Sequence, residues 1–123
     1  MPGSVQVLHD HPIIETSYRG VVSPESLSLL VRETIMTSRA SGVTRLLADC
    51  TELAGGHSVV DLYAMVEAFL ANDPDGAARE AVLLPKGHEA FENVRFWDNV
   101  CRNRGLCVRL FEDRGQAVAW LME

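Results

Sequence analysis

Apolar and polar residues alternate along the first part of the chain, as is typical of extended strands. The alternation runs from residue 5 to about residue 8 and again from 13 to 18, with the period of two that places one side of a strand against a core. Between these stretches, Pro12 disfavours a helical conformation at His11. The pattern therefore predicts two strands joined by a turn over residues 9–12, which is an antiparallel hairpin.

Two longer stretches carry apolar residues at helical spacing and begin with capping signals. In the first, Ser23 precedes a proline at the first helical position, and Gly42 suits a left-handed helix end. In the second, Ser58 and Asp61 have the spacing of a capping box, and the helix is expected to stop before the turn cluster of residues 72–76. The predicted buried faces are Leu27, Leu30, Val31, Thr34, Ile35 and Ser38 in the first helix, and Val59, Leu62, Tyr63, Val66, Phe69 and Leu70 in the second.

Two further helices are expected in the second half of the chain. The third runs from about residue 88 to residue 104 and is closed by Gly105. The fourth begins near Asp113, which has Gln116 at another capping-box spacing. Residues at helical spacing predict the buried faces, Ala90, Val94, Trp97 and Cys101 in the third helix and Ala117, Trp120 and Leu121 in the fourth.

Three short apolar runs separate these helices, over residues 45–50, 81–84 and 107–111. Each is too short for a helix and long enough for a buried strand, and residues 51–57 are expected to form a loop. The order ββαβαβαβα predicts an α/β fold, a small and mainly parallel sheet with an N-terminal antiparallel hairpin and helices packed on it. The aromatic side chains are expected to fill the core, or alternatively to line an apolar pocket in it; they are Phe91, Trp97, Phe111 and Trp120.

The bulk properties limit the function classes. A chain of 123 residues with 47% hydrophobic residues predicts one domain over residues 1–123. Its net charge of −6 argues against nucleic-acid binding, which needs clustered Lys and Arg. An odd number of cysteines, three, with no CxxC spacing indicates a reducing compartment. Neither a signal peptide nor an apolar run long enough for membrane insertion is evident, so a cytoplasmic location is expected.

The element order resembles the STAS domain, and more closely the SpoIIAA-like (STAS/SEC14-type) family of small bacterial proteins. That resemblance implies a regulatory protein that binds a protein partner. In anti-sigma-factor antagonists of this family, a strand ends in an aspartate, and a kinase phosphorylates a serine that follows at the start of the next helix. Asp49 and Ser58 match these positions, although the Asp-Ser-Ser-Gly type sequence of the family is replaced by His57-Ser58-Val59-Val60. The segments that carry the resemblance are residues 20–25, 45–49, 79–84, 108–111 and 116–121.

A small polar ligand is a second possibility, because ligands of open parallel sheets bind beyond the carboxyl ends of the strands. Capping and turn roles explain the same residues and are the favoured interpretation. The candidate ligand contacts at this edge are Asp49, Thr51, His57, Ser58, Lys86, His88, Glu112 and Asp113.

Three other patterns fit ordinary structural roles better than chemical ones. Residues 55–56 are a glycine pair before a helix, but they lack the other residues of a phosphate-binding loop. His9 and His11 have no third ligand at metal-site spacing. Cys50 and His57 lack a third group to orient them as a nucleophile and its base. No metal site, cofactor or catalytic set is therefore predicted.

An association surface is expected on the first helix. Leu29 and Met36 are seven residues apart, so they share a stripe that points away from the buried face. Charges of both signs border this stripe, as in a small contact patch with a polar rim. We expect a homodimer or a heteromeric contact that includes both residues.

Three functional hypotheses remain in order. The first is a non-enzymatic STAS-like module that binds a protein partner, gated by phosphorylation of Ser58. The second is a binder of a small apolar or anionic ligand in the interior. The third is an enzyme at the strand ends, which ranks last because no catalytic pair can be assembled.

Overall fold

The computed structural model describes residues 2–73 and 76–123 and has the predicted order of elements. The sheet is five-stranded, in the order β1-β2-β3-β4-β5. Only β1 is antiparallel to its neighbour; the other pairs are parallel. In chain order the elements are β1 (Gly3–Val7), β2 (Ile13–Val21), α1 (Pro24–Ser41), β3 (Arg45–Gly55), α2 (Val59–Asn72), β4 (Arg79–Leu83), α3 (His88–Asn103), β5 (Cys107–Phe111) and α4 (Arg114–Leu121).

The predicted fold class is therefore confirmed. Glu80 of β4 pairs with Leu46 of β3 on one side and with Val108 of β5 on the other, both in parallel register. The hairpin of β1 and β2 forms the antiparallel edge. Because each parallel pair is joined by a helix, the crossovers place helices on the faces of the sheet.

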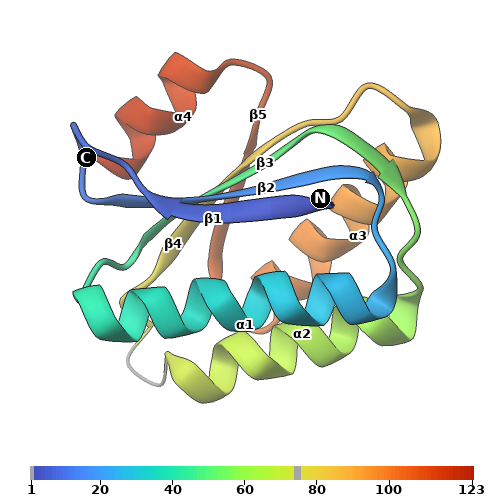
Figure 1. Cartoon of the computed structure of the whole chain (residues 1–123), viewed down its shortest axis with the longest axis horizontal. Coiled ribbons are helices and arrows are strands. Elements are labelled where there is room, and N and C mark those ends of the chain that lie inside the picture. The colour runs from blue at the N-terminus through green and yellow to red at the C-terminus, as the bar shows by residue number, and fades with distance from the viewer. Residues whose placement is uncertain (1, 74–75) are drawn as a thin grey trace.

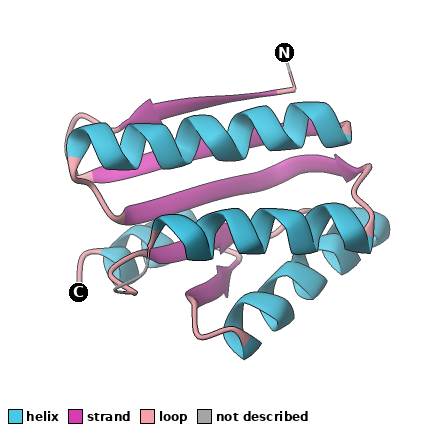
Figure 2. Cartoon of the chain, turned by 90° about the horizontal axis from the view of Figure 1, so that it is seen from below, coloured by secondary structure: helices cyan, strands magenta, loops and turns pink. Residues whose placement is uncertain are grey.

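The helices cover the two faces unequally (Figure 1). α1, α2 and α3 pack on one face, and α1 and α2 run side by side across it (Figure 2). The shorter α4 lies on the opposite face, against β3, β4 and β5. The core accordingly has a large cluster beneath the three helices and a small one beneath α4.

The third strand is longer than predicted, and the expected loop over residues 51–57 is wrong. β3 continues to Gly55, because β2 also continues to Val21 and pairs with it beyond the end of β4. Leu53 is buried in this extension. The strand ends at two glycines with positive φ, Gly55 at 117° and Gly56 at 104°, a conformation that other residues rarely adopt.

The aromatic side chains lie at the margins of the core rather than at its centre, which corrects the predicted burial of Trp97 and Trp120. Both are half-buried. The indole N–H of Trp97 donates to Glu80 at 2.7 Å, and the ring of Trp120 lies 4.5 Å from the guanidinium of Arg79. Large rings with a polar contact suit such half-wet positions. The fully buried side chains are aliphatic or cysteine, namely Ile13, Ile14, Val22, Leu47, Val66, Val82, Cys101 and Leu121.

The buried face of α2 is also narrower than predicted. Leu62 and Val66, one helical turn apart, are buried, whereas Val59 and Tyr63 are exposed. Tyr63 instead packs edge-on against Phe96 of α3, with ring centroids 5.6 Å apart. The start of α2 therefore presents apolar side chains to solvent.

Candidate functional site

Ser58 lies at the N-cap of α2, as the capping-box spacing predicted. Its Oγ accepts from the backbone N–H of Asp61 at 3.2 Å, and the Ser58 backbone N–H donates to Asp61 Oδ2 at 3.1 Å. Hydrogen bonding to Ser58, through its side chain and then its backbone, lowers the pKa of Asp61. Ser58 is exposed, so this hydroxyl is both a structural cap and accessible to a modifying enzyme.

Exposed valines surround this serine. Val60 is 76% exposed, and Val21 at the end of β2 is 74% exposed. Gly56 brings the two segments together, because a Cβ on Gly56 would lie 2.7 Å from the Val22 carbonyl oxygen and 3.0 Å from Val21 Cγ1. α1 and α2 begin at the same end of the molecule (Figure 1). We call the surface formed by Val21, Gly56, Ser58, Val59 and Val60 the helix-start patch.

The other candidates at the strand ends do not converge on one site. Leu47 and Leu83 belong to the cluster beneath α4, so by the period of two Asp49 and Thr51 face the same side. Asp49 Oδ1 already accepts from the Thr51 backbone N–H at 3.0 Å and from its hydroxyl at 2.7 Å. His57, in contrast, lies on the side of α1, α2 and α3, where it lines a cavity.

The remaining members of the set are exposed. Lys86 and His88 lie where β4 leads into α3, and Glu112 precedes the cap of α4. Asp113 is that cap: its Oδ2 accepts from the Gln116 backbone N–H at 2.9 Å. The prediction of a shared ligand edge is therefore wrong, because the alternation of the strands divides its members between two faces.

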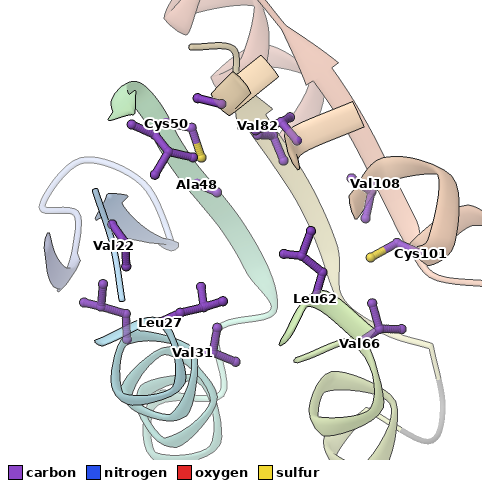
Figure 3. Packing of buried hydrophobic residues seen from close by; sticks show 14 of the residues in the cluster. Val22, Leu27, Val31, Ala48, Cys50, Leu62, Val66, Val82, Cys101 and Val108 are labelled. Carbon is purple, nitrogen blue, oxygen red and sulfur yellow. The ribbon is translucent and has the colours of Figure 1, made fainter. Parts of the chain in front are cut away.

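A cavity of about 50 Å³ lies between the inner face of the sheet and the three helices, and the sequence did not locate it. Most of its walls are aliphatic, and several of the side chains that form them converge in Figure 3. No Lys or Arg is among the lining residues. Its polar or ionisable members are Tyr18, Cys50, His57, Glu80, Asn93 and the indole of Trp97.

Burial keeps the titratable groups of this cavity neutral or nearly so. It raises the pKa of Glu80 to about 7, against the opposing effect of the hydrogen bond from Trp97. It also raises the pKa values of Tyr18 and Cys50 well above their ordinary values. Cys50 and His57 do line the same cavity, but a protonated thiol is a weak nucleophile, so the pair is not poised for thiolate chemistry.

His57 and Asn93 stand out because each has a buried polar atom without a partner among the described residues, His57 Nε2 and Asn93 Oδ1. Asn93 Nδ2 donates to the His57 backbone carbonyl at 3.3 Å, which places the two residues side by side. Burial lowers the pKa of His57, against the effect of Asp61. One signal for this site was in the sequence: Asn93 lies three residues after Ala90 and four before Trp97, so it is a polar residue on the predicted buried face of α3.

Other proposed chemistry finds no support within residues 2–73 and 76–123. These residues bring together no group of three or more His, Cys, Asp or Glu side chains that could hold a metal ion. All three cysteines are free, and Cys107 is exposed. Among the described segments, none of the helices combines the length and apolar character that crossing a bilayer requires.

Leu29 and Met36 lie on the outer face of α1, 63% and 62% exposed. Their orientation away from the core is as predicted. Glu25 and Arg32 lie beside Leu29 along a surface depression, which gives this stripe charged neighbours of both signs.

Solved structures with the same fold are similar to nearly the whole chain. The anti-sigma factor antagonist SpoIIAA in its unphosphorylated form has 14% identity and a TM-score of 0.65 over 98% of this chain and 97% of its own. An anti-sigma factor antagonist from Mycobacterium paratuberculosis has 13% identity and a TM-score of 0.66, over 98% and 93% of the two chains. An uncharacterised protein with a SpoIIAA-like fold from Shewanella loihica has 20% identity and a TM-score of 0.56, over 97% and 91%.

These likenesses show that the chain has the SpoIIAA-like fold of the STAS superfamily. No protein-family model matches the sequence, and no curated protein matches it significantly.

Proposed function

We propose that this chain is a non-enzymatic regulatory module that binds a protein partner through the helix-start patch and is gated at Ser58. The observation that carries the proposal is an exposed serine at a helix N-cap, set among the exposed side chains of Val21, Val59 and Val60. Exposed apolar side chains gathered on one surface commonly mark interaction sites. The fold likeness to anti-sigma factor antagonists supports the same class of function.

Phosphorylation would act on this patch through elementary electrostatics. A phosphate on Ser58 would add about −1.5 to −2 charge units close to the positive end of α2. It would also stand beside the Asp61 carboxylate, which holds the Ser58 backbone N–H at 3.1 Å. Like charges at that distance repel, so the modified serine would give up the capping box. An apolar docking surface would become an anionic one, and a partner that fits the valines would be released.

The test is to cross-link the chain to its partners in the source organism and to compare variants by mass spectrometry. We expect one discrete heteromeric product with the wild type, reduced by about tenfold or more in Val60→Glu and in Ser58→Asp, because a charge buried at an interface without a partner costs more than about 1.4 kcal/mol. Val7→Glu is the matched control, since Val7 is an exposed valine on the edge strand β1.

Equal yields from all four proteins would contradict the docking surface. Intact-mass measurement of the same samples reports the gate separately: added phosphate on the wild type that is absent from Ser58→Ala supports it. A wild type that carries no phosphate under any growth condition contradicts it.

We also propose self-association through α1, with Leu29 and Met36 in the contact. A two-fold axis lets one patch cover its own copy. The wild type should sediment as a dimer in analytical ultracentrifugation, and Leu29→Glu with Met36→Glu should sediment as a monomer. Val60→Glu, which charges the helix-start patch instead, should remain dimeric. If the wild type and the double variant sediment alike, α1 is not the contact.

A further inference from the structure

The cavity beneath α1, α2 and α3 contains hydrogen-bonding capacity that the described part of the chain leaves unused. Asn93 Oδ1 can only accept a hydrogen bond, whereas His57 Nε2 can donate or accept according to its tautomer. Both atoms are buried and unpartnered in the described residues. A buried polar atom without a partner is destabilising, so a group that bonds both atoms would be bound favourably.

The chemistry of the walls selects that group. Asn93 Oδ1 needs a donor, and the neighbouring His57 Nε2–H would then need an acceptor. A hydroxyl provides both with one oxygen atom. The other walls are mostly aliphatic, among them Leu27, Leu53 and Val94, so the rest of the ligand should be apolar.

Charge and size narrow the class further. An anion would meet no Lys or Arg in the lining and would lie near the Glu80 carboxyl. Desolvating a charge without a partner is unfavourable, so an anionic ligand does not fit. A volume of about 50 Å³ holds roughly four water-sized groups, which is the size of a short alcohol.

We propose that this cavity is a binding site for a small uncharged molecule with one hydroxyl group and a short apolar body, the hydroxyl bonded to Asn93 Oδ1 and His57 Nε2. The proposal does not depend on the protein-binding function. It replaces the anionic alternative for the interior ligand with a neutral one and assigns residues to hold it.

The experiment is an NMR titration of the full chain with 1-propanol, which matches the cavity in size. Propionate replaces the hydroxyl by a charge, and 1-chloropropane removes it. We expect saturable shifts of the Asn93 side-chain amide, the Trp97 indole N–H and the His57 imidazole nitrogens with 1-propanol, at millimolar concentration because so few atoms are buried. Propionate and 1-chloropropane should bind about tenfold more weakly or not at all, since each lacks the paired hydrogen bonds.

Two variants make the test specific. Asn93→Leu keeps the approximate volume and removes the acceptor, so saturable binding of 1-propanol should be lost. Asn99→Leu makes the same change at an exposed position of the same helix and should bind as the wild type does. The His57 imidazole shifts in the wild type need no variant, so they keep the test decisive even if Asn93→Leu unfolds.

The outcomes separate clearly. Shifts that rise linearly without saturation, or wild-type shifts confined to residues outside the cavity, would mean that water alone occupies it and would overturn the proposal. Equal binding of 1-propanol and 1-chloropropane would overturn the assignment of the hydroxyl. Equal binding of propionate would overturn the neutral class.

Discussion

Replacing Leu121 by alanine should lower the free energy of unfolding by about 2–5 kcal/mol, as truncation of a fully buried leucine does. Leu121 has no exposed surface and packs with Ile13, Leu47 and Ala117 in the small cluster beneath α4. α4 has only eight residues, too few to be stable alone. Its place on the sheet therefore depends on this contact, and urea denaturation of the two proteins measures it.

Leu29→Ala is the matched control because it makes the same chemical change on an exposed helix face. Measured where the chain is monomeric, it should alter the stability by no more than about 0.5 kcal/mol. A Leu121→Ala protein as stable as Leu29→Ala would mean that α4 is not anchored at this point. Trp120 is the less suitable probe, since its half-buried ring also contacts Arg79.

The ends of several helices could be predicted from the sequence because local chemistry decides them. Ser23 and Ser58 cap α1 and α2 through hydrogen bonds to residues only three positions away. Gly42 ends α1 with a positive φ of 76°, which a residue without a Cβ adopts at no steric cost. Such features need no knowledge of distant contacts, and for these positions the sequence was enough.

The length of β3 could not be predicted in the same way, because a distant segment decides it. Residues 51–55 become strand because β2 extends alongside them, with Gly20 paired to Leu53 and Val21 to Gly55. The side chains of this stretch alone resemble a loop. The faces of the sheet were more accessible: the period of two already places Asp49 and Thr51 on one side of β3 and Cys50 on the other.

The cavity is the part of the site that the sequence could not locate. It exists because α1, α2 and α3 leave space above Ala48 and Val82, and that space depends on how three helices pack together. The sequence did contain one polar residue on the buried face of α3, Asn93. It could not say that the side-chain oxygen would lack a partner, because this depends on where His57 comes to lie.

Glu80 is the second group for which we expect a large effect, and it makes stability depend on pH. Its carboxyl lines the cavity and accepts the indole N–H of Trp97. Burial, opposed by this hydrogen bond and reinforced by the charge of Asp98, raises its pKa from 4.5 to about 7. The folded protein therefore keeps the Glu80 proton over a range in which the unfolded chain has already lost it.

The sign follows from this difference in bound protons. Below pH 4.5 both states carry the proton, and Glu80 has no influence on the balance. As the pH rises from 4.5 to about 7, the unfolded state loses the proton first, so the free energy of unfolding falls. Above that range the loss is complete, on the order of 3 kcal/mol for a shift of this size. Tyr18 and Cys50 stay neutral throughout, because burial raises both of their pKa values.

Glu80→Gln should remove this dependence, since glutamine does not titrate and its side-chain oxygen can still accept from Trp97. Urea denaturation should find the variant close to the wild type at about pH 5 and more stable at about pH 8.5, by an amount on the order of 3 kcal/mol. Glu52→Gln changes an exposed carboxyl of β3 and should follow the wild type at both pH values. If Glu80→Gln also follows the wild type, the carboxyl is solvated in the folded protein, and water reaches the floor of the cavity.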